Sequence, residues 1–96
     1  MNNRVKFAYL AQKELEHSYD WYEERSIGLG SRFADSIMAT IAKILKNPDS
    51  YPRKKHNNRE IQVDKFPFII VYSYDEVTDI IQILRVFHTK RNPKLK

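Results

Sequence analysis

Side chains that could bind or cleave a phosphodiester lie close together near the C-terminal end of the chain. Arg85 and His88 interrupt residues 80–88, a stretch that is otherwise almost entirely apolar. A buried arginine without a partner is costly, so Arg85 must either pair with an acid or reach a surface groove. A neutral histidine titrates at about pH 6.5. His88 is therefore suited either to acid–base chemistry or to a structural role at the end of a sheet.

The alternation of side chains along a strand predicts the faces on which these two residues lie. Arg85 should share one face with Ile81 and Ile83, and His88 should lie with Val86 on the other. Lys90 follows two residues after His88, and its ammonium group adds a further hydrogen-bond donor for a phosphate at the end of the strand.

The positive charge of the chain is uneven. The formal net charge is +5, and residues 36–96 carry twelve Lys and Arg against six acids. The basic residues form a loop cluster and a C-terminal cluster: Arg53, Lys54, Lys55 and Arg59, then Arg85, Lys90, Arg91, Lys94 and Lys96. Such clusters attract phosphate backbones or acidic protein surfaces, although a basic tail can also simply increase solubility.

Other kinds of site are poorly supported. Gly28-Leu29-Gly30 follows a predicted helix, whereas a dinucleotide-binding loop follows a strand, so a turn between helices is the better interpretation. His17, His56 and His88 are far apart and lack a paired ligand, and there is no cysteine, so no metal site is predicted. No cofactor site and no serine nucleophile motif are found.

Trp21 precedes Tyr22 in the first predicted helix and lies at the border of its apolar face. One interpretation is core packing at the edge of a sheet. The other is an exposed aromatic anchor for a partner protein, because tryptophan is enriched in binding hot spots.

The elements that must position these residues follow from hydrophobic periodicity. We predict a strand at 4–9, helices at 11–26 and 31–46, a polar loop at 48–58, and strands at 60–63, 66–74 and 80–88. Ser31 is expected to cap the second helix. The fold class is therefore α+β, in the order β-α-α-β-β-β, with an antiparallel helical hairpin packed on one face of a small twisted antiparallel sheet.

The length and the apolar content limit the protein class. The chain of 96 residues predicts a single domain, 1–96, with a basic tail at 90–96. The longest apolar stretch has seven residues, 66–72, whereas a membrane span needs about 20. The N-terminus lacks the apolar segment of a signal peptide. We therefore expect a cytoplasmic protein that has no membrane partner.

The order of these features resembles the RelE/ParE superfamily, the toxins of bacterial type II toxin–antitoxin (plasmid-stabilisation) pairs. The resemblance covers residues 5–93. It rests on Ala11 and Leu15, Trp21-Tyr22, Gly28-Leu29-Gly30 before Phe33, Ile37, Ile41 and Ile44, Asn47-Pro48, Tyr51-Pro52, Arg59, the run from Phe66 to Tyr72, and the run from Val86 to Pro93.

The resemblance implies one of two activities. RelE-like members are ribosome-dependent mRNA endonucleases, and that branch would make His88, Arg85 and Arg91 catalytic. ParE-like members are linked to inhibition of DNA gyrase without catalysis of their own. The run at 69–72 lacks the central-strand arginine of RelE, and no tyrosine follows Tyr74, so the chain resembles the ParE-like branch more closely. A third alternative is a non-toxic homologue that serves as an interaction module.

The resemblance also implies partners. A cognate antitoxin is expected, together with gyrase or the ribosome and its mRNA as target. The protein could assemble as a homodimer or as a hetero-oligomer with the antitoxin. The residues expected to contact the target or a nucleic acid are Lys54, Lys55, Arg59, Lys90 and Arg91, and Trp21 is the residue expected to contact a partner protein.

Overall fold

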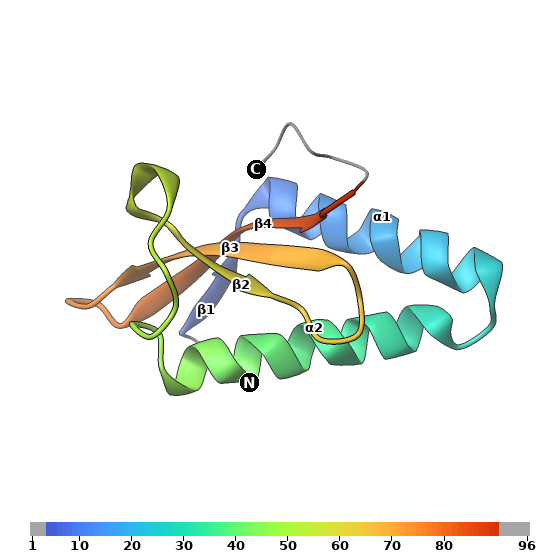
Figure 1. The fold of residues 1–96 in the computed structure, drawn as a ribbon, viewed down its shortest axis with the longest axis horizontal. Helices are drawn as coiled ribbons and strands as arrows, with labels where there is room; N and C mark the ends of the chain where they lie inside the picture. Colours follow the sequence, from blue (N-terminus) through green and yellow to red (C-terminus); the bar gives the residue numbers. More distant parts are fainter. Residues whose placement is uncertain (1–3, 91–96) are drawn as a thin grey trace.

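Between residues 4 and 90, the part of the chain that the computed structural model describes, two α-helices pack against a four-stranded sheet (Figure 1). The elements are β1 (Val5–Phe7), α1 (Tyr9–Arg25), α2 (Leu29–Lys46), a short 3-10 helix (Lys55–Asn57), β2 (Arg59–Gln62), β3 (Phe68–Asp75) and β4 (Ile80–His88). The predicted α+β class and element order are confirmed. Over residues 4–90, neither helix combines the length and the apolar content that a membrane-crossing segment needs.

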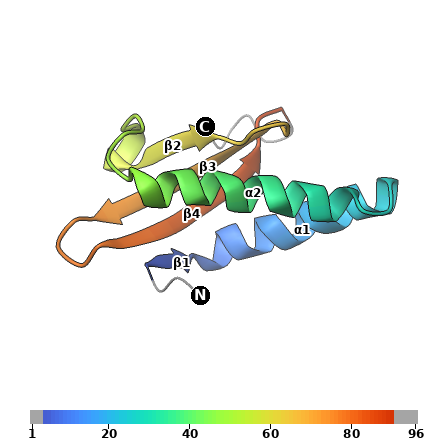
Figure 2. The same ribbon diagram turned by 90° about the horizontal axis from the view of Figure 1, so that it is seen from below.

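The helix α2 supplies the main apolar stripe of the core. Phe33, Ile37, Ile41 and Ile44 recur every three or four residues and are fully or almost fully buried. They face the buried side of β3, whose alternate residues are Phe68, Ile70 and Tyr72. Both helices lie on this one face of the sheet, as predicted (Figure 2).

The helix α1 buries only a narrow stripe of its surface. Ala11, Ser18 and Tyr22 are buried, whereas Tyr19 is exposed. The helix lies at the side of α2 and along β4, so only a thin line of its surface meets the core. For a similar reason Met38, on α2, remains exposed although its position lies beside the core stripe.

The turn between the helices is stabilised by a carboxylate. Gly28 has a left-handed φ of 90°, which favours glycine. The carboxylate of Glu23 accepts hydrogen bonds from the main-chain N–H groups of Gly28 and Gly30, each at 3.0 Å. The predicted cap at Ser31 is wrong, because α2 begins at Leu29 and Glu23 already occupies N–H groups at its start.

The strand order in the sheet is β1-β4-β3-β2. The three later strands form the predicted antiparallel meander. At the edge, β1 pairs with β4 in parallel, so the sheet is mixed instead of wholly antiparallel. The chain passes from β1 into α1, and both of these elements lie along β4.

An irregularity in β4 changes which face its polar residues occupy. Val71 pairs with Arg85 and Tyr72 pairs with Ile83, so Leu84 is an extra residue without a partner in the register. Arg85 therefore lies on the face opposite to that of Ile83, and our prediction from simple alternation was wrong at this point. A one-residue insertion inverts every later side chain relative to the earlier ones.

Replacing Gly30 with alanine is expected to destabilise the fold. A Cβ atom at this position would lie 2.9 Å from both the Tyr19 carbonyl oxygen and Glu23 Oε1. The overpacking should cost about 1–3 kcal/mol, more than the roughly 1 kcal/mol that helix propensity would return. Urea unfolding would measure the change, with Ser31→Ala as the neighbouring control. Equal stability of Gly30→Ala and the control would contradict the close helix contact.

Candidate functional site

A groove of about 750 Å³ lies between α1 and the end of β4. The pairing of β1 with β4 ends at Ile83, and beyond that point α1 runs along the outer edge of β4. Residues from both elements line the groove, among them Lys13, Glu14, His17, Arg85 and His88. The two predicted catalytic residues that the structure describes therefore border one groove.

Arg85 is held by an acid from α1. Its Nε lies 3.1 Å from both carboxylate oxygens of Glu14, and its terminal Nη2 makes a short ion pair with Oε2. Oε1 of Glu14 also accepts the main-chain N–H of Val86 at 2.8 Å. The two side chains are only 20% and 16% exposed. A bidentate pair in such a position fixes both side chains and neutralises the arginine charge.

His88 lies at the end of β4 on the face opposite to that of Arg85, because it pairs with Phe68. Its ring meets the Phe68 ring edge-on, with centroids 5.2 Å apart. Its Nδ1 accepts the main-chain N–H of Lys90 at 3.0 Å. The neutral ring therefore carries its proton on Nε2.

Arg91 lies outside the described residues, and Lys90 is exposed at their end. Of the three residues predicted to act together in a ribonuclease, Arg85 is neutralised by Glu14 and His88 is half-buried, while the position of Arg91 is not described. Within the described part of the chain, no three His, Asp or Glu side chains are grouped so that they could hold a metal ion.

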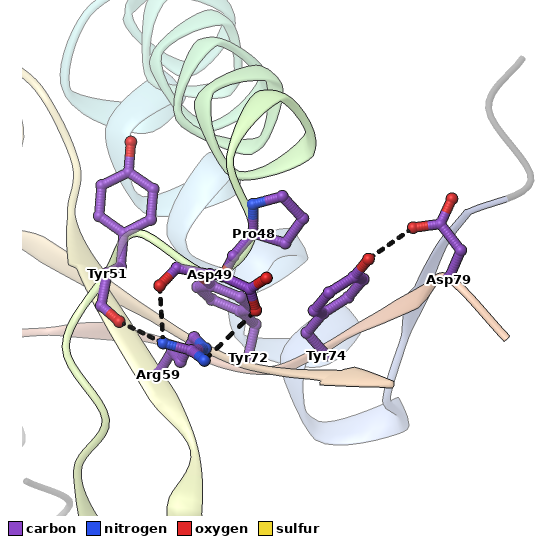
Figure 3. Close-up of polar contacts among 7 residues, drawn as sticks. All are labelled: Pro48, Asp49, Tyr51, Arg59, Tyr72, Tyr74 and Asp79. Atoms are coloured by element: carbon purple, nitrogen blue, oxygen red, sulfur yellow. Dashed lines mark hydrogen bonds and ion pairs between the residues drawn. The ribbon is translucent and has the colours of Figure 1, made fainter. Parts of the chain in front are cut away.

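Arg59, predicted as a target contact, is bonded within the protein (Figure 3). Its Nη1 donates to the carbonyl oxygens of Asp49 at 3.0 Å and Tyr51 at 2.8 Å, and its Nη2 pairs with the Asp49 carboxylate at 3.4 Å. Next to it, the Tyr72 hydroxyl donates to the Pro48 carbonyl oxygen at 2.7 Å. These bonds fix the chain between α2 and β2, and we refer to Arg59 and Tyr72 as the loop clasp.

The surroundings of two tyrosines shift their pKa values. Burial raises the pKa of Tyr72 to about 12, against the opposing effect of the nearby Arg59 charge. The pKa of Tyr74 is raised mainly because its hydroxyl donates to Asp79, and the same hydrogen bond lowers the pKa of Asp79. Arg4 also pairs with Asp79 at 2.9 Å, which ties the β3–β4 turn to the start of β1.

Arg59, of the loop cluster, and His88, beside the last described residues, lie at different ends of the sheet. Arg59 pairs with Tyr72, whereas His88 pairs with Phe68, which lies four residues before Tyr72 in β3. At about 3.3 Å per residue, this separates them by roughly 13 Å along the strands, and two strand spacings across add roughly 10 Å. Lys54 and Lys55 are exposed in the loop that precedes Arg59, and Lys90 is exposed just after His88.

Trp21 packs against the core, as the first of its two interpretations expects, and its contact with a partner protein stays a prediction. It is half-buried, and its ring meets Tyr22 edge-on with centroids 5.2 Å apart. The guanidinium of Arg25 lies 3.3 Å from the centroid of the Trp21 ring. A tryptophan covered by an arginine gains a cation–π contact, which holds the ring in a fixed position near the tip of the hairpin.

Sequence reasoning missed Glu14 and the role of Tyr72. The apolar context of Arg85 predicted either an acid partner or a surface groove, but the chain has twelve acids, and Glu14 is 71 residues away. Tyr72 reads as one more apolar residue of a buried strand, and its hydroxyl partner is a main-chain carbonyl that leaves no trace in the sequence.

Comparisons with known proteins give two findings. The family model of the ParE toxin of the type II toxin–antitoxin system parDE matches residues 5–93. Among solved structures, a chain of the chromosomal ParDE toxin–antitoxin system from P. aeruginosa superposes with a TM-score of 0.71 at 20% sequence identity, covering 88% of this chain and 92% of that chain. A search of curated proteins gives no match.

Breaking the pair between α1 and β4 should be costly. Glu14→Gln leaves the Arg85 charge uncompensated, and the expected loss in unfolding free energy is about 2–4 kcal/mol, somewhat below the range for a fully buried pair. Arg85→Met keeps the apolar volume, so the double variant should lose less than the sum of the single losses. Urea unfolding measures the free energy of unfolding of Glu14→Gln, Arg85→Met and the double variant. Glu16→Ala, which removes an exposed pair with Lys13, is the control and should leave the midpoint unchanged. A Glu14→Gln variant as stable as this control would contradict the assignment.

The raised pKa of Tyr72 predicts a stability change in alkali. The unfolded tyrosine loses its proton at about pH 10, while the folded one keeps its proton to about pH 12. The contribution is complete below pH 10 and is lost as the pH rises towards 12, so unfolding becomes easier over that interval. Tyr72→Phe should lose stability at neutral pH, because the Pro48 carbonyl loses its donor, and should show a smaller fall between pH 10 and 12. Parallel slopes for the two proteins would disprove the assignment.

Proposed function

Since the chain belongs to the ParE toxin family of type II toxin–antitoxin systems, we propose that it inhibits DNA gyrase and is neutralised by a cognate antitoxin. The proposal concerns a toxin that works by binding. The observation that carries it is the engagement of Arg85 by Glu14, because this arginine is the strongest candidate for stabilising charge in a phosphodiester cleavage.

Phosphodiester cleavage requires cations that are available to the developing negative charge. Arg85 already has a carboxylate at hydrogen-bonding distance on two of its nitrogens, and substrate phosphate would have to displace that carboxylate. The central strand adds no cation, since β3 contains no lysine, arginine or histidine. A groove arranged in this way favours binding over catalysis.

Neutralisation by an antitoxin is supported by the surface that the fold leaves available. The sheet face opposite the helices carries half-buried Ile69 and Val71 on β3, and the loop 53–58 is exposed and basic. An acidic segment that folds on binding could cover surfaces of both kinds. The antitoxin is therefore expected to be acidic and partly disordered when free.

A second candidate function, ribosome-dependent mRNA cleavage, is favoured by one observation. His88 borders the same groove as Arg85 and His17, and histidine is the side chain that most often serves as a general acid or base. In that case His88 would act as the acid or base, and Glu14 would have to release Arg85 when the substrate binds.

Induced expression in a bacterium, without antitoxin, separates the two functions. A gyrase inhibitor should produce filamentous cells with intact mRNA, and the purified chain should block supercoiling of relaxed plasmid by gyrase. Relaxation by topoisomerase I in the same buffer is the control for non-specific DNA effects. His88→Ala should remain toxic under the binding mechanism and lose its toxicity under the nuclease mechanism.

Three results would overturn the proposal. Supercoiling that continues at a large excess of the chain would exclude gyrase as the target. Cleaved mRNA in arrested ribosomes, abolished by His88→Ala, would establish the nuclease instead. Normal growth during expression would point to a non-toxic homologue that serves only as an interaction module.

A further inference from the structure

Residues 53–58 form a short surface segment made entirely of polar side chains. The segment reads Arg-Lys-Lys-His-Asn-Asn, and every one of these side chains can donate hydrogen bonds, His56 through a ring nitrogen. Residues 53–57 are exposed, and Asn58 is half-buried. The segment contains no acid: Asp49 before it is bonded to Arg59, and Glu60 follows it.

The backbone of this segment is held in one shape. Lys54 N–H donates to the Asn58 carbonyl at 2.6 Å, and Glu60 N–H donates to the Pro52 carbonyl at 3.2 Å. The main chain at Arg53 forms an isolated antiparallel β-bridge with Arg59, so the segment folds back on the outer edge of β2. The tip is a 3-10 turn in which His56 and Asn57 have left-handed φ values of 59° and 64°.

The loop clasp anchors both ends of the segment to the domain. Arg59 holds the carbonyls of Asp49 and Tyr51 on the side that precedes the segment, while its own main chain is part of β2. Tyr72, from the central strand β3, holds the Pro48 carbonyl. The cost of ordering the segment has therefore been met before any ligand arrives, which strengthens binding.

We propose that this segment, residues 53–58, is a preformed binding site for the phosphodiester backbone of a double-stranded nucleic acid. Arg53, Lys54 and Lys55 are the contact residues, and Arg59 is a positioning residue. The assignment differs from the sequence prediction in adding Arg53 and in removing Arg59 from the contact surface. It does not depend on gyrase being the target.

The chemistry of the segment favours a nucleic acid over an acidic protein. Stable protein interfaces have apolar or aromatic residues at their centre, and residues 53–58 provide none. Contacts to a phosphate backbone are made by lysine, arginine and asparagine without an apolar centre. The folded-back segment also projects from the edge of the sheet (Figures 1 and 2), where the curved surface of a duplex can approach it.

The salt dependence of duplex binding tests the proposal. Fluorescence anisotropy with a labelled 20-base-pair DNA would give the affinity of the full-length chain between about 50 and 200 mM salt. The logarithm of the affinity falls with the logarithm of salt by about 0.9 per phosphate contact. The triple variant Arg53→Gln, Lys54→Gln, Lys55→Gln should therefore reduce this slope by about 2–3 and weaken binding about tenfold or more.

A charge-matched variant separates a local site from the general basicity of the chain. Lys6→Gln, Arg32→Gln, Lys65→Gln removes the same charge from exposed positions on β1, on α2 and between β2 and β3. It should change the slope by less than one phosphate contact. Equal losses for the two triple variants would overturn the proposal, as would an unmodified chain that does not bind the duplex. An RNA duplex of the same length shows which nucleic acid is preferred.

The positioning role of Arg59 has its own readout. Arg59→Lys keeps the charge, but an ammonium cannot reproduce the fork that joins the carbonyls of Asp49 and Tyr51. The affinity for the duplex should fall about threefold while the salt slope stays unchanged, because the phosphate contacts remain and only the backbone of the segment becomes less ordered. A reduced slope would make Arg59 a contact residue. If the 53–55 triple variant lost binding to purified gyrase protein while keeping its affinity for duplexes, an acidic protein surface would replace the nucleic acid as ligand.

Discussion

The main-chain N–H of Val86 lies on an edge of β4 where the pairing with β1 has already ended at Ile83. A buried N–H without an acceptor would cost about 1–3 kcal/mol. The structure provides the acceptor from a helix, since Glu14 on α1 reaches across to Val86 and pairs with Arg85 at the same time. This contact sets the position of α1 against the sheet. The turn at Gly28, closed by Glu23, then places α2 over the core.

The same pair determines what the groove between α1 and β4 can do. An arginine held by a carboxylate is a rigid, neutralised group, whereas a cleavage site needs cations directed at the substrate. Arg85 and His88 also lie on opposite faces of β4, because the strand alternates regularly between them. A mechanism by binding follows more directly from this arrangement than a catalytic one.

A second group of side chain–main chain bonds organises the other end of the domain. Arg59 and Tyr72 hold three carbonyl groups of the chain that leaves α2. One consequence is that Arg59 is only 11% exposed and is not available to a ligand. The other is that residues 53–58 present their charges from a fixed backbone. The two ends of the sheet thus differ, with a neutralised arginine at the groove and exposed cations at the loop.

The sequence by itself determined the secondary structure and the distribution of charge, because both depend on local spacing. The stripe of Phe33, Ile37, Ile41 and Ile44 and the period-two strands predict a helical hairpin on a sheet without further information. Only the tertiary structure decided that β1 joins in parallel, that Leu84 is an extra residue, and that Arg85 pairs with Glu14. Contacts between residues about 70 positions apart depend on how the elements pack, and any of several acids would satisfy the local requirement equally well. For the same reason the sequence could group Arg59 with Lys54 and Lys55, while the fold turned one inward and the others outward.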